Sequence, residues 1–191
     1  KRIVLQDWND TPFYIRDPEN RVVRWPFFGG NLSGIREKLD YLQSLGVGVL
    51  YLNPIFLASS NHKYDTADYL QIDPGFGNEE DFSALCKEAK LRGIRILLDG
   101  VFSHTGDDSV YFNRYGNFPE PGAYSDGESP YDSWYQFDES KPCGYSCWWN
   151  VDSLPNVDET NPDYQEMICG ENGVIRKWLR LGASGWRLDV A

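Results

Sequence analysis

Three segments of this chain repeat one order of signals: an amphipathic helical stretch, a glycine and a short apolar stretch. The glycines that end the helical stretches are Gly46, Gly93 and Gly182. The predicted helices cover residues 31–45, 78–93 and 161–182, and the predicted strands cover residues 47–53, 94–99 and 185–189. Helices that alternate with strands in this way indicate an α/β fold with a parallel sheet.

Each predicted helix begins at an asparagine and turns one apolar face inward. Asn31, Asn78 and Asn161 are the expected N-caps, because a short side-chain oxygen accepts hydrogen bonds from the free N–H groups of the first turn. The strand over residues 47–53 is expected to be buried. The inward-facing helical residues are Leu32, Ile35, Leu39, Leu42 and Leu45 in the first helix and Phe82, Leu85, Cys86 and Ala89 in the second.

Polar residues stand at the carboxyl end of each predicted strand: Asn53, Asp99 and Asp189. A doubly wound sheet and an eightfold barrel both place their chemistry at these ends, so the repeat alone does not choose between them. No glycine-rich fingerprint follows a predicted strand, and Gly29-Gly30 precedes a helix without a suitable strand before it. A dinucleotide is therefore not the expected ligand.

Arg187 and Asp189 lie two residues apart in the last apolar run. Since strand side chains alternate between faces, both should project the same way. An arginine so placed favours the ionised carboxylate that nucleophilic attack by an aspartate requires. A structural ion pair is the alternative, and the strand pattern by itself does not separate the two.

The formal net charge is −11, from 18 Lys and Arg against 29 Asp and Glu. This balance opposes binding to nucleic acid or to a membrane surface and favours a neutral ligand. Aromatic residues make up 15% of the chain, with seven Trp, and they serve either to stack on sugars or to fill a core. No stretch reaches the roughly 20 apolar residues of a membrane span and no signal peptide opens the chain, so a soluble protein is expected, in a compartment that the sequence does not reveal.

The four cysteines are Cys86, Cys143, Cys147 and Cys169. Their spacing is neither CxxC nor paired with histidines, so no zinc site is predicted. Cys86 is expected to be an inert thiol on a buried helix face. A disulfide between Cys143 and Cys147 stays open, because both lie in a loop-rich region of unknown redox environment.

The stretch from Thr105 to about Val157 separates the second predicted strand from the third predicted helix and is rich in Tyr, Pro, Gly, Ser and Trp. A structureless loop of that length is unusual, so we expect a small inserted subdomain or lid. The predicted units are residues 1–104, 105–157 and 158–191.

Four short segments carry a resemblance to a known family. They read NHKYDTADY at 61–69, DGVFSH at 99–104, LPNVDE at 154–159 and GWRLDVA at 185–191. Together, in this order, they resemble glycoside hydrolase family 13, the α-amylase family. Within that family the chain is most similar to the neopullulanase, cyclomaltodextrinase and maltogenic amylase group, which shares the HKYDTADY stretch.

The resemblance implies a (β/α)8 TIM barrel with a small domain between the third strand and the third helix, where residues 105–157 stand. The chain would then hold about strands two to four, a partial barrel. A barrel cut after strand four leaves unpaired strand edges, and these can template association. The isolated chain is therefore expected to self-associate or to be disordered.

The same resemblance implies roles for six residues. Asp189 is the expected nucleophile, which forms a covalent glycosyl-enzyme intermediate with retention of configuration. Arg187 would hold that carboxylate ionised, and Asp99 would orient the arginine. The three expected sugar-binding residues are His104, which donates a hydrogen bond at the cleavage subsite, Tyr64, which stacks beneath the same sugar, and His62, a neighbouring hydrogen-bond donor.

The function implied is a retaining α-glucan hydrolase that cleaves α-1,4 and, as a further option, α-1,6 bonds of starch-derived oligosaccharides. Transglycosylation comes with the same chemistry, and the sequence does not decide whether water or a second sugar takes the intermediate. Its general acid, in the family a Glu at the end of strand five, would lie beyond Ala191, and the acidic residues before Asp189 do not match it. The isolated chain is therefore expected to be inactive. The alternative is a non-catalytic carbohydrate-binding or interaction module with the same fold.

Two positions depart from the family pattern. Many members carry Asn where Ser103 stands, and many α-amylases carry Asp where Asn156 stands, and both positions help to bind a structural calcium ion. Calcium prefers carboxylate and carbonyl oxygens, so the usual calcium site is not predicted and no cofactor is expected. A loop site among Asp107, Asp108 and the region of Asp126 is the alternative, and it is equally a solvated acidic patch.

Overall fold

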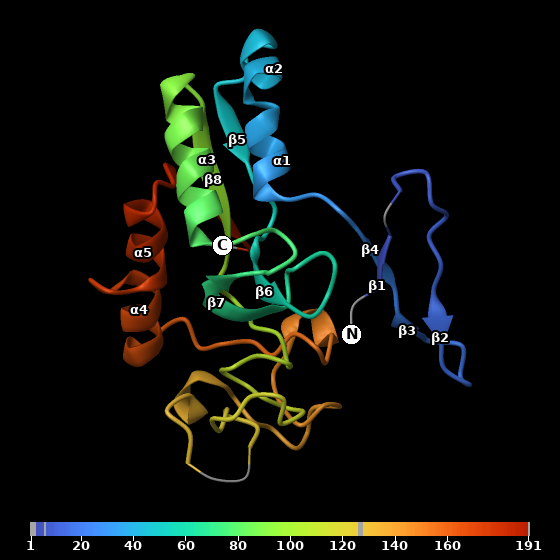
Figure 1. Ribbon diagram of the computed structural model, residues 1–191. Coiled ribbons are helices and arrows are strands. Elements are labelled where there is room, and N and C mark those ends of the chain that lie inside the picture. The colour runs from blue at the N-terminus through green and yellow to red at the C-terminus, as the bar shows by residue number, and fades with distance from the viewer. Residues whose placement is uncertain (1–2, 6, 126–127, 191) are drawn as a thin grey trace.

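A computed structural model describes residues 3–5, 7–125 and 128–190. A three-stranded parallel sheet lies at its centre, in the order β5 (Val49–Tyr51), β8 (Arg95–Val101) and β9 (Gly185–Asp189). Figure 1 shows the helices gathered around β5 and β8. The predicted parallel α/β sheet is confirmed. Within the described residues the sheet is open, with β5 and β9 at its edges.

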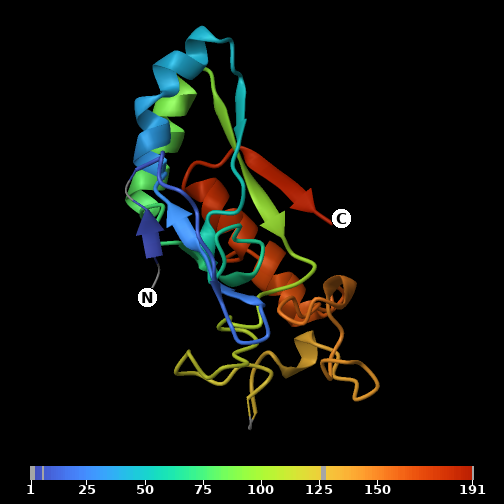
Figure 2. The ribbon, with the colours of Figure 1, turned by 90° about the vertical axis from the view of Figure 1, so that its right-hand side faces the viewer.

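Helices cover one face of this sheet and leave the other free. Figure 2 shows α1 (Leu32–Glu37), α2 (Leu39–Ser44) and α3 (Glu79–Leu91) on one side of β5 and β8. Ile96 and Leu98 point toward these helices and are fully buried. The residues between and beside them in β8 point to the opposite face of the sheet, because strand side chains alternate. One face therefore forms the apolar core, and the other is free to carry polar groups.

The three predicted asparagine caps are confirmed. Asn31 Oδ1 accepts a hydrogen bond from the Gly34 N–H at 2.8 Å. Asn78 forms a reciprocal capping box with Asp81, and Asn161 Oδ1 accepts from two N–H groups of the first turn of α4 (Pro162–Cys169). These caps satisfy donors that a helix cannot pair internally, which is why the three helices begin where they do.

The first and third predicted helices are each broken, contrary to the prediction of continuous helices. The Lys38 N–H donates to the Ile35 carbonyl three residues back, which interrupts the ladder between α1 and α2. The third splits into α4 and α5 (Val174–Arg180). A Cβ on Gly170 would lie 2.4 Å from the Glu166 carbonyl oxygen, a backbone atom that cannot swing aside, so the chain can leave the helix this closely only at a glycine.

Two expectations about burial in the first repeat are wrong. Leu45 follows α2 and is 61% exposed. The predicted buried strand over residues 47–53 shortens to β5, in which Val49 is 47% and Tyr51 41% exposed. The reason is that Val49 and Tyr51 point to the sheet face that the helices leave free. The inward placement of Leu32, Leu39, Phe82 and Leu85 is confirmed.

The remaining strands lie outside the repeat that the sequence revealed. β6 (Phe56–Ala58) pairs antiparallel with β7 (Thr66–Ile72) directly after β5. Before α1, the chain forms a parallel pair, β1 (Ile3–Leu5) with β4 (Pro26–Phe28), and a short hairpin, β2 (Ile15–Arg16) with β3 (Val22–Arg24), which projects away from the sheet in Figure 1.

The segment between β8 and α4 has little regular structure but a dense aromatic core. It contains two short 3₁₀ helices, η1 (Asp132–Trp134) and η2 (Trp148–Asn150), and lies at the lower end of the molecule in Figure 1. Its buried rings belong to Tyr111, Phe112, Trp134, Tyr135 and Tyr145. Four isolated β-bridges hold it together. One pairs His104, where the segment begins, with Asn156 near its end, and the other three pair residues within its later half. The boundaries 1–104, 105–157 and 158–191 stay a prediction.

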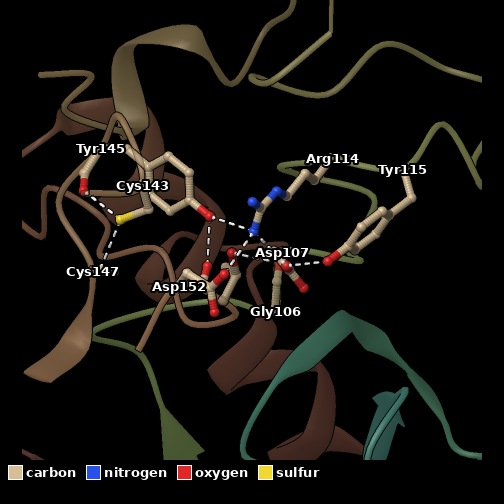
Figure 3. Close-up of polar contacts among 9 residues, drawn as sticks. Gly106, Asp107, Arg114, Tyr115, Cys143, Tyr145, Cys147 and Asp152 are labelled. Carbon is tan, nitrogen blue, oxygen red and sulfur yellow. Dashed lines mark hydrogen bonds and ion pairs between the residues drawn. The ribbon is translucent and has the colours of Figure 1, made fainter. Parts of the chain in front are cut away.

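The cysteines lie in two different environments. Cys86 lies on the buried face of α3, as expected, and burial raises the pKa of its thiol to about 12. The Sγ atoms of Cys143 and Cys147 lie 3.2 Å apart as free thiols, beside the ion pair of Arg114 and Asp107 that Figure 3 shows. No helix of the described residues is long and apolar enough to cross a membrane.

Trp178 connects the helices to the strands, so its loss should be costly. The ring is fully buried against Phe56 and Phe82, and its Nε1–H donates to the Tyr69 carbonyl at 2.9 Å. We expect Trp178→Ala to lower the free energy of unfolding by about 3–5 kcal/mol. Trp178→Phe should cost about 1–3 kcal/mol, because it leaves that carbonyl unpaired. Urea unfolding measures both.

Leu91→Ala serves as the control for that series, since Leu91 is 78% exposed at the end of α3. A change of no more than about 0.5 kcal/mol is expected for this surface substitution. An equal loss for Leu91→Ala and Trp178→Ala would contradict the role given to the buried ring.

Candidate active site

An arginine bridges two carboxylates on neighbouring strands. Asp99 lies opposite Arg187 in the register of β8 and β9, and Val101 lies opposite Asp189. Arg187 Nη1 donates to Asp99 Oδ1 at 3.0 Å and also to Asp189 Oδ1. The predicted common direction of Arg187 and Asp189 is thereby confirmed. These side chains occupy the sheet face that the helices leave free.

Asp99 is the most enclosed member of this group and accepts hydrogen bonds on both oxygens. Its side chain is fully buried, whereas that of Asp189 is 15% exposed. Besides Arg187 on Oδ1, it accepts from Tyr64 Oη at 3.1 Å and from Tyr51 Oη on Oδ2. Hydrogen bonds to the two carboxylates raise the pKa of Arg187, which keeps the guanidinium charged.

Tyr51 is a member of the site that the sequence did not reveal. Burial and the neighbouring Asp99 carboxylate raise the pKa of its phenol, so it remains a proton donor in the hydrogen bond. The Arg187 guanidinium also lies over the Tyr51 ring, 5.8 Å from its centroid. Strand alternation was the signal that could have found it. Tyr51, at the end of β5, stands two residues before the predicted strand-end residue Asn53, and residues two apart in a strand share a face.

His62 and Tyr64 lie together on the loop between β6 and β7. Their rings stack with centroids 6.1 Å apart, and His62 Nδ1 accepts from the Tyr64 N–H at 3.2 Å. Between them Lys63 turns inward, with a left-handed backbone (φ 67°) and its Nζ 2.8 Å from Asp73 Oδ2. This buried ion pair anchors the loop, and the His62 side chain is left exposed beside a half-buried Tyr64.

His104 is buried where the inserted segment begins. Its Nε2 lies 3.2 Å from the Tyr64 carbonyl and its Nδ1 lies 3.1 Å from Ser103 Oγ. A carbonyl only accepts, so these partners assign the proton of the neutral ring to Nε2. Burial lowers the pKa of His104, and the bond to the Tyr64 carbonyl and the charge of Asp189 partly oppose this. Both ring nitrogens thus have partners within the chain.

The geometry gathers all six residues that the sequence singled out. Asp99, Arg187 and Asp189 form one ion-paired group, Tyr64 joins it through Asp99, and His62 and His104 each contact Tyr64. A family model described as the alpha-amylase catalytic domain matches residues 7–191. The chain belongs to the alpha-amylase family.

Curated relatives agree with this membership. The chain is 46% identical to an amylopullulanase of Thermoanaerobacterium saccharolyticum, over 96% of this chain and 16% of that protein. It is 41% identical to neopullulanase 2 of Thermoactinomyces vulgaris, over 86% of this chain and 28% of that protein. The chain spans between 10% and 30% of the length of such relatives. The predicted likeness to neopullulanases, maltogenic amylases and cyclomaltodextrinases is confirmed.

Solved structures of this family share the fold. The type III pullulan hydrolase of Thermococcus kodakarensis superimposes with a TM-score of 0.78 at 35% identity, over all of this chain and 31% of that one. The alpha-amylase catalytic domain is a TIM barrel, and the described residues are a part of it that does not close. The ion-paired group sits near the carboxyl ends of β8 and β9, the end at which TIM barrels hold their active sites.

The carboxylates in the described part of this alpha-amylase domain are dispersed and do not cluster. No group of three or more His, Cys, Asp or Glu that could hold a metal ion lies together there. The Ser103 hydroxyl forms a hydrogen bond with His104, and Asp107 forms an ion pair with Arg114. Asp108 accepts from Asn117, and Asp126 lies outside the described residues. Ser103, Asp107 and Asp108 thus have partners within the described residues, and the expected lack of a calcium site stays a prediction.

The burial of His104 predicts a loss of stability in mild acid. Its pKa in the folded chain lies below the ordinary value of 6.5, so the unfolded chain binds the proton more readily. The resulting stability is present above about pH 6.5 and is lost as the pH falls through the lower pKa of the folded state. NMR titration of the two imidazoles should show His104 with a midpoint below 6.5.

The unfolding free energy at pH 7 and pH 5 completes that test. His104→Gln should reduce the loss between these two pH values, whereas His62→Gln keeps it, because His104 is still present. His62 is the matched control, since it is the only other histidine and is exposed. The same pH dependence in His104→Gln and in the parent chain would contradict this assignment.

Proposed function

We propose that this chain supplies the nucleophile and part of the sugar-binding site of a retaining α-glucan hydrolase. The observation that carries the proposal is the pairing of Asp99, Arg187 and Asp189 on the free sheet face, next to the stacked rings of His62 and Tyr64. A retaining glycosidase needs an ionised carboxylate beside a sugar-binding surface, and this group provides both.

Asp189 is the proposed nucleophile. Arg187 binds Oδ1, and among the described residues Oδ2 has no hydrogen-bond partner, which leaves it to attack the anomeric carbon. Attack forms a bond between Oδ2 and that carbon while the bond to the leaving oxygen breaks, and water then hydrolyses the glycosyl ester. Arg187 orients the carboxylate, and Asp99 positions Arg187.

The proton for the leaving group must come from another residue. Asp99 is the candidate for this general acid, because it shares Arg187 with Asp189. Both of its oxygens, however, accept hydrogen bonds, from Arg187, Tyr51 and Tyr64. A general acid presents a proton to the leaving oxygen, about 5 to 5.5 Å from the nucleophile in retaining enzymes. Asp99 is therefore assigned to positioning and not to proton donation.

The proposed substrates are α-glucans with α-1,4 or α-1,6 bonds. Support comes from the names of the relatives, which include amylopullulanases, neopullulanases and cyclomaltodextrinases, and a cyclic α-maltosyl-(1→6)-maltose hydrolase of Arthrobacter globiformis. The net charge of −11 suits an uncharged saccharide. Tyr64 would stack on the sugar at the cleavage subsite, with His62 at its hydroxyl groups. His104 would reach the same sugar by exchanging its Nε2 bond to the Tyr64 carbonyl for one to a hydroxyl group.

A non-catalytic saccharide-binding module is the second candidate. One observation favours it. Asp99, the carboxylate that shares Arg187 with Asp189, has no free oxygen that could carry and donate a proton to the leaving group. Such a module would bind α-glucan through the same rings but would form no covalent intermediate.

A fluorinated α-glucosyl fluoride separates the two candidates, because fluoride leaves without help from a general acid. We expect the protein that carries this sequence to acquire one glucosyl group on the peptide containing Asp189, as read by mass spectrometry. Asp189→Asn should abolish both the label and maltooligosaccharide hydrolysis. Glu80→Gln, an exposed carboxylate on α3, is the control and should keep both.

Labelling of a different carboxylate, or full labelling of Asp189→Asn, would overturn the assignment of the nucleophile. Binding of maltoheptaose without any label would favour the saccharide-binding module.

A further inference from the structure

Trp149 is the most exposed large apolar side chain among the described residues, at 82%. Its backbone is left-handed, with φ 49° and ψ 31°, and Asn150 follows with φ 60°. A bulky residue rarely adopts this conformation, and such strain persists where the surrounding structure imposes it. The chain therefore holds an indole ring in water at a conformational cost.

The exposed ring is joined to the candidate active site by stacked rings. Trp149 stacks on Trp148 with centroids 4.9 Å apart and planes within 4°. The Trp148 ring in turn lies 5.8 Å from the ring of His104. A series of packed rings thus leads from the buried imidazole beside Tyr64 out to Trp149, whose one face rests on Trp148 while the ring as a whole stays open to solvent.

The loop that carries the two indoles is closed tightly at its base. The Trp148 N–H donates to the Leu154 carbonyl at 2.9 Å, and the Val151 N–H donates to the Trp148 carbonyl at 2.9 Å. Cys147 and Pro155 form an isolated bridge directly outside this closure. These contacts fix the backbone on both sides of Trp149, so a ligand would meet a ring that needs little further ordering.

A cavity lined by polar side chains begins at the residue that follows Trp149 in the chain. A cavity of about 300 Å³ begins at Asn150 and is lined also by Arg114, Lys141 and Asp152. Figure 3 shows Arg114 and Asp152 directed toward each other on its wall. Ligand pockets start at roughly this volume. An exposed apolar ring, followed in the chain by a cavity with amide, carboxylate and cationic groups, matches a sugar, which has a C–H face and a rim of hydroxyl groups.

We propose that Trp149 is a second sugar platform, which binds a glucosyl residue of the α-glucan at a distance from the bond to be cleaved. The inference rests on the proposed function and adds a subsite in the inserted segment to it. A nucleobase can also stack on Trp, but a chain with a net charge of −11 repels its phosphates, so a neutral saccharide is the ligand that the charge favours.

Binding of maltoheptaose to the protein that carries this sequence tests the platform directly. The Asp189→Asn background prevents turnover, and tryptophan fluorescence or calorimetry reports affinity. Trp149→Ala should weaken binding about three- to tenfold, the range expected for loss of one aromatic stack. Trp149→Phe should recover most of the affinity, because a phenyl ring offers the same flat face.

Chain length gives a readout that a merely structural role would not move. In the active protein, Trp149→Ala should lower the ratio of kcat/KM for maltoheptaose to that for maltotriose about three- to tenfold, mainly through KM, because only the longer substrate reaches the platform. Tyr41→Ala is the control, since Tyr41 is an aromatic residue, 61% exposed on α2, and Figure 1 shows α2 at the top of the molecule, away from the inserted segment.

The outcomes distinguish this inference from the proposed function. Unchanged maltoheptaose binding in Trp149→Ala, or equal losses for the long and short substrates, would overturn the platform whatever the fate of Asp189. Full hydrolysis by Asp189→Asn would overturn the proposed nucleophile, and the ratio of kcat/KM for maltoheptaose to that for maltotriose in the active protein would still decide on Trp149. Thermal unfolding of Trp149→Ala and Trp149→Phe checks that both variants are folded.

Discussion

The guanidinium of Arg187 is the interaction on which the rest of the site depends. It lies between two carboxylates on adjacent strands, and one of these, Asp99, is fully buried. Burying a carboxylate without a cation and hydrogen-bond donors costs folding free energy, and two carboxylates on one face repel each other. The register of β8 and β9 meets this requirement by placing Arg187 directly opposite Asp99. Tyr51 and Tyr64 complete the hydrogen bonding from β5 and from the loop before β7. The geometry of four chain segments is thus set by the need to satisfy one buried anion.

The sheet can carry this charged group because its two faces have been separated by strand alternation. Ile96 and Leu98 are buried beneath the helices, and Asp99, the next residue, points to the face that the helices leave free. Burial of the apolar face supplies the stability, since apolar area removed from water is the dominant favourable contribution to folding. The polar face is then available for chemistry. This division is the physical basis for finding the candidate site near the carboxyl ends of the strands.

Much of this arrangement could be predicted from the sequence, because it follows from local rules. The asparagine caps, the parallel strands and the common direction of Arg187 and Asp189 depend on spacing and alternation alone. The breaks between α1 and α2 and between α4 and α5 could not, because they depend on a single N–H turning back to Ile35 and on the close approach of Gly170 to Glu166. Tyr51 was missed for a related reason. Its partner Asp99 is 48 residues away, and only the cross-strand register shows that they meet.

His104 contacts three parts of the molecule that lie apart in the sequence. Its Nε2 holds the loop of Tyr64, its neighbour Ser103 supplies a hydroxyl to Nδ1, and its ring packs on Trp148 of the inserted segment. Protonation at Nδ1 need not break the contact with Ser103, because a hydroxyl accepts as readily as it donates. The lowered pKa therefore reflects loss of hydration around a charged ring and not loss of a partner. An imidazole kept neutral by burial can join the sheet, the sugar-binding loop and the inserted segment without adding a charge beside the Asp99–Arg187–Asp189 group.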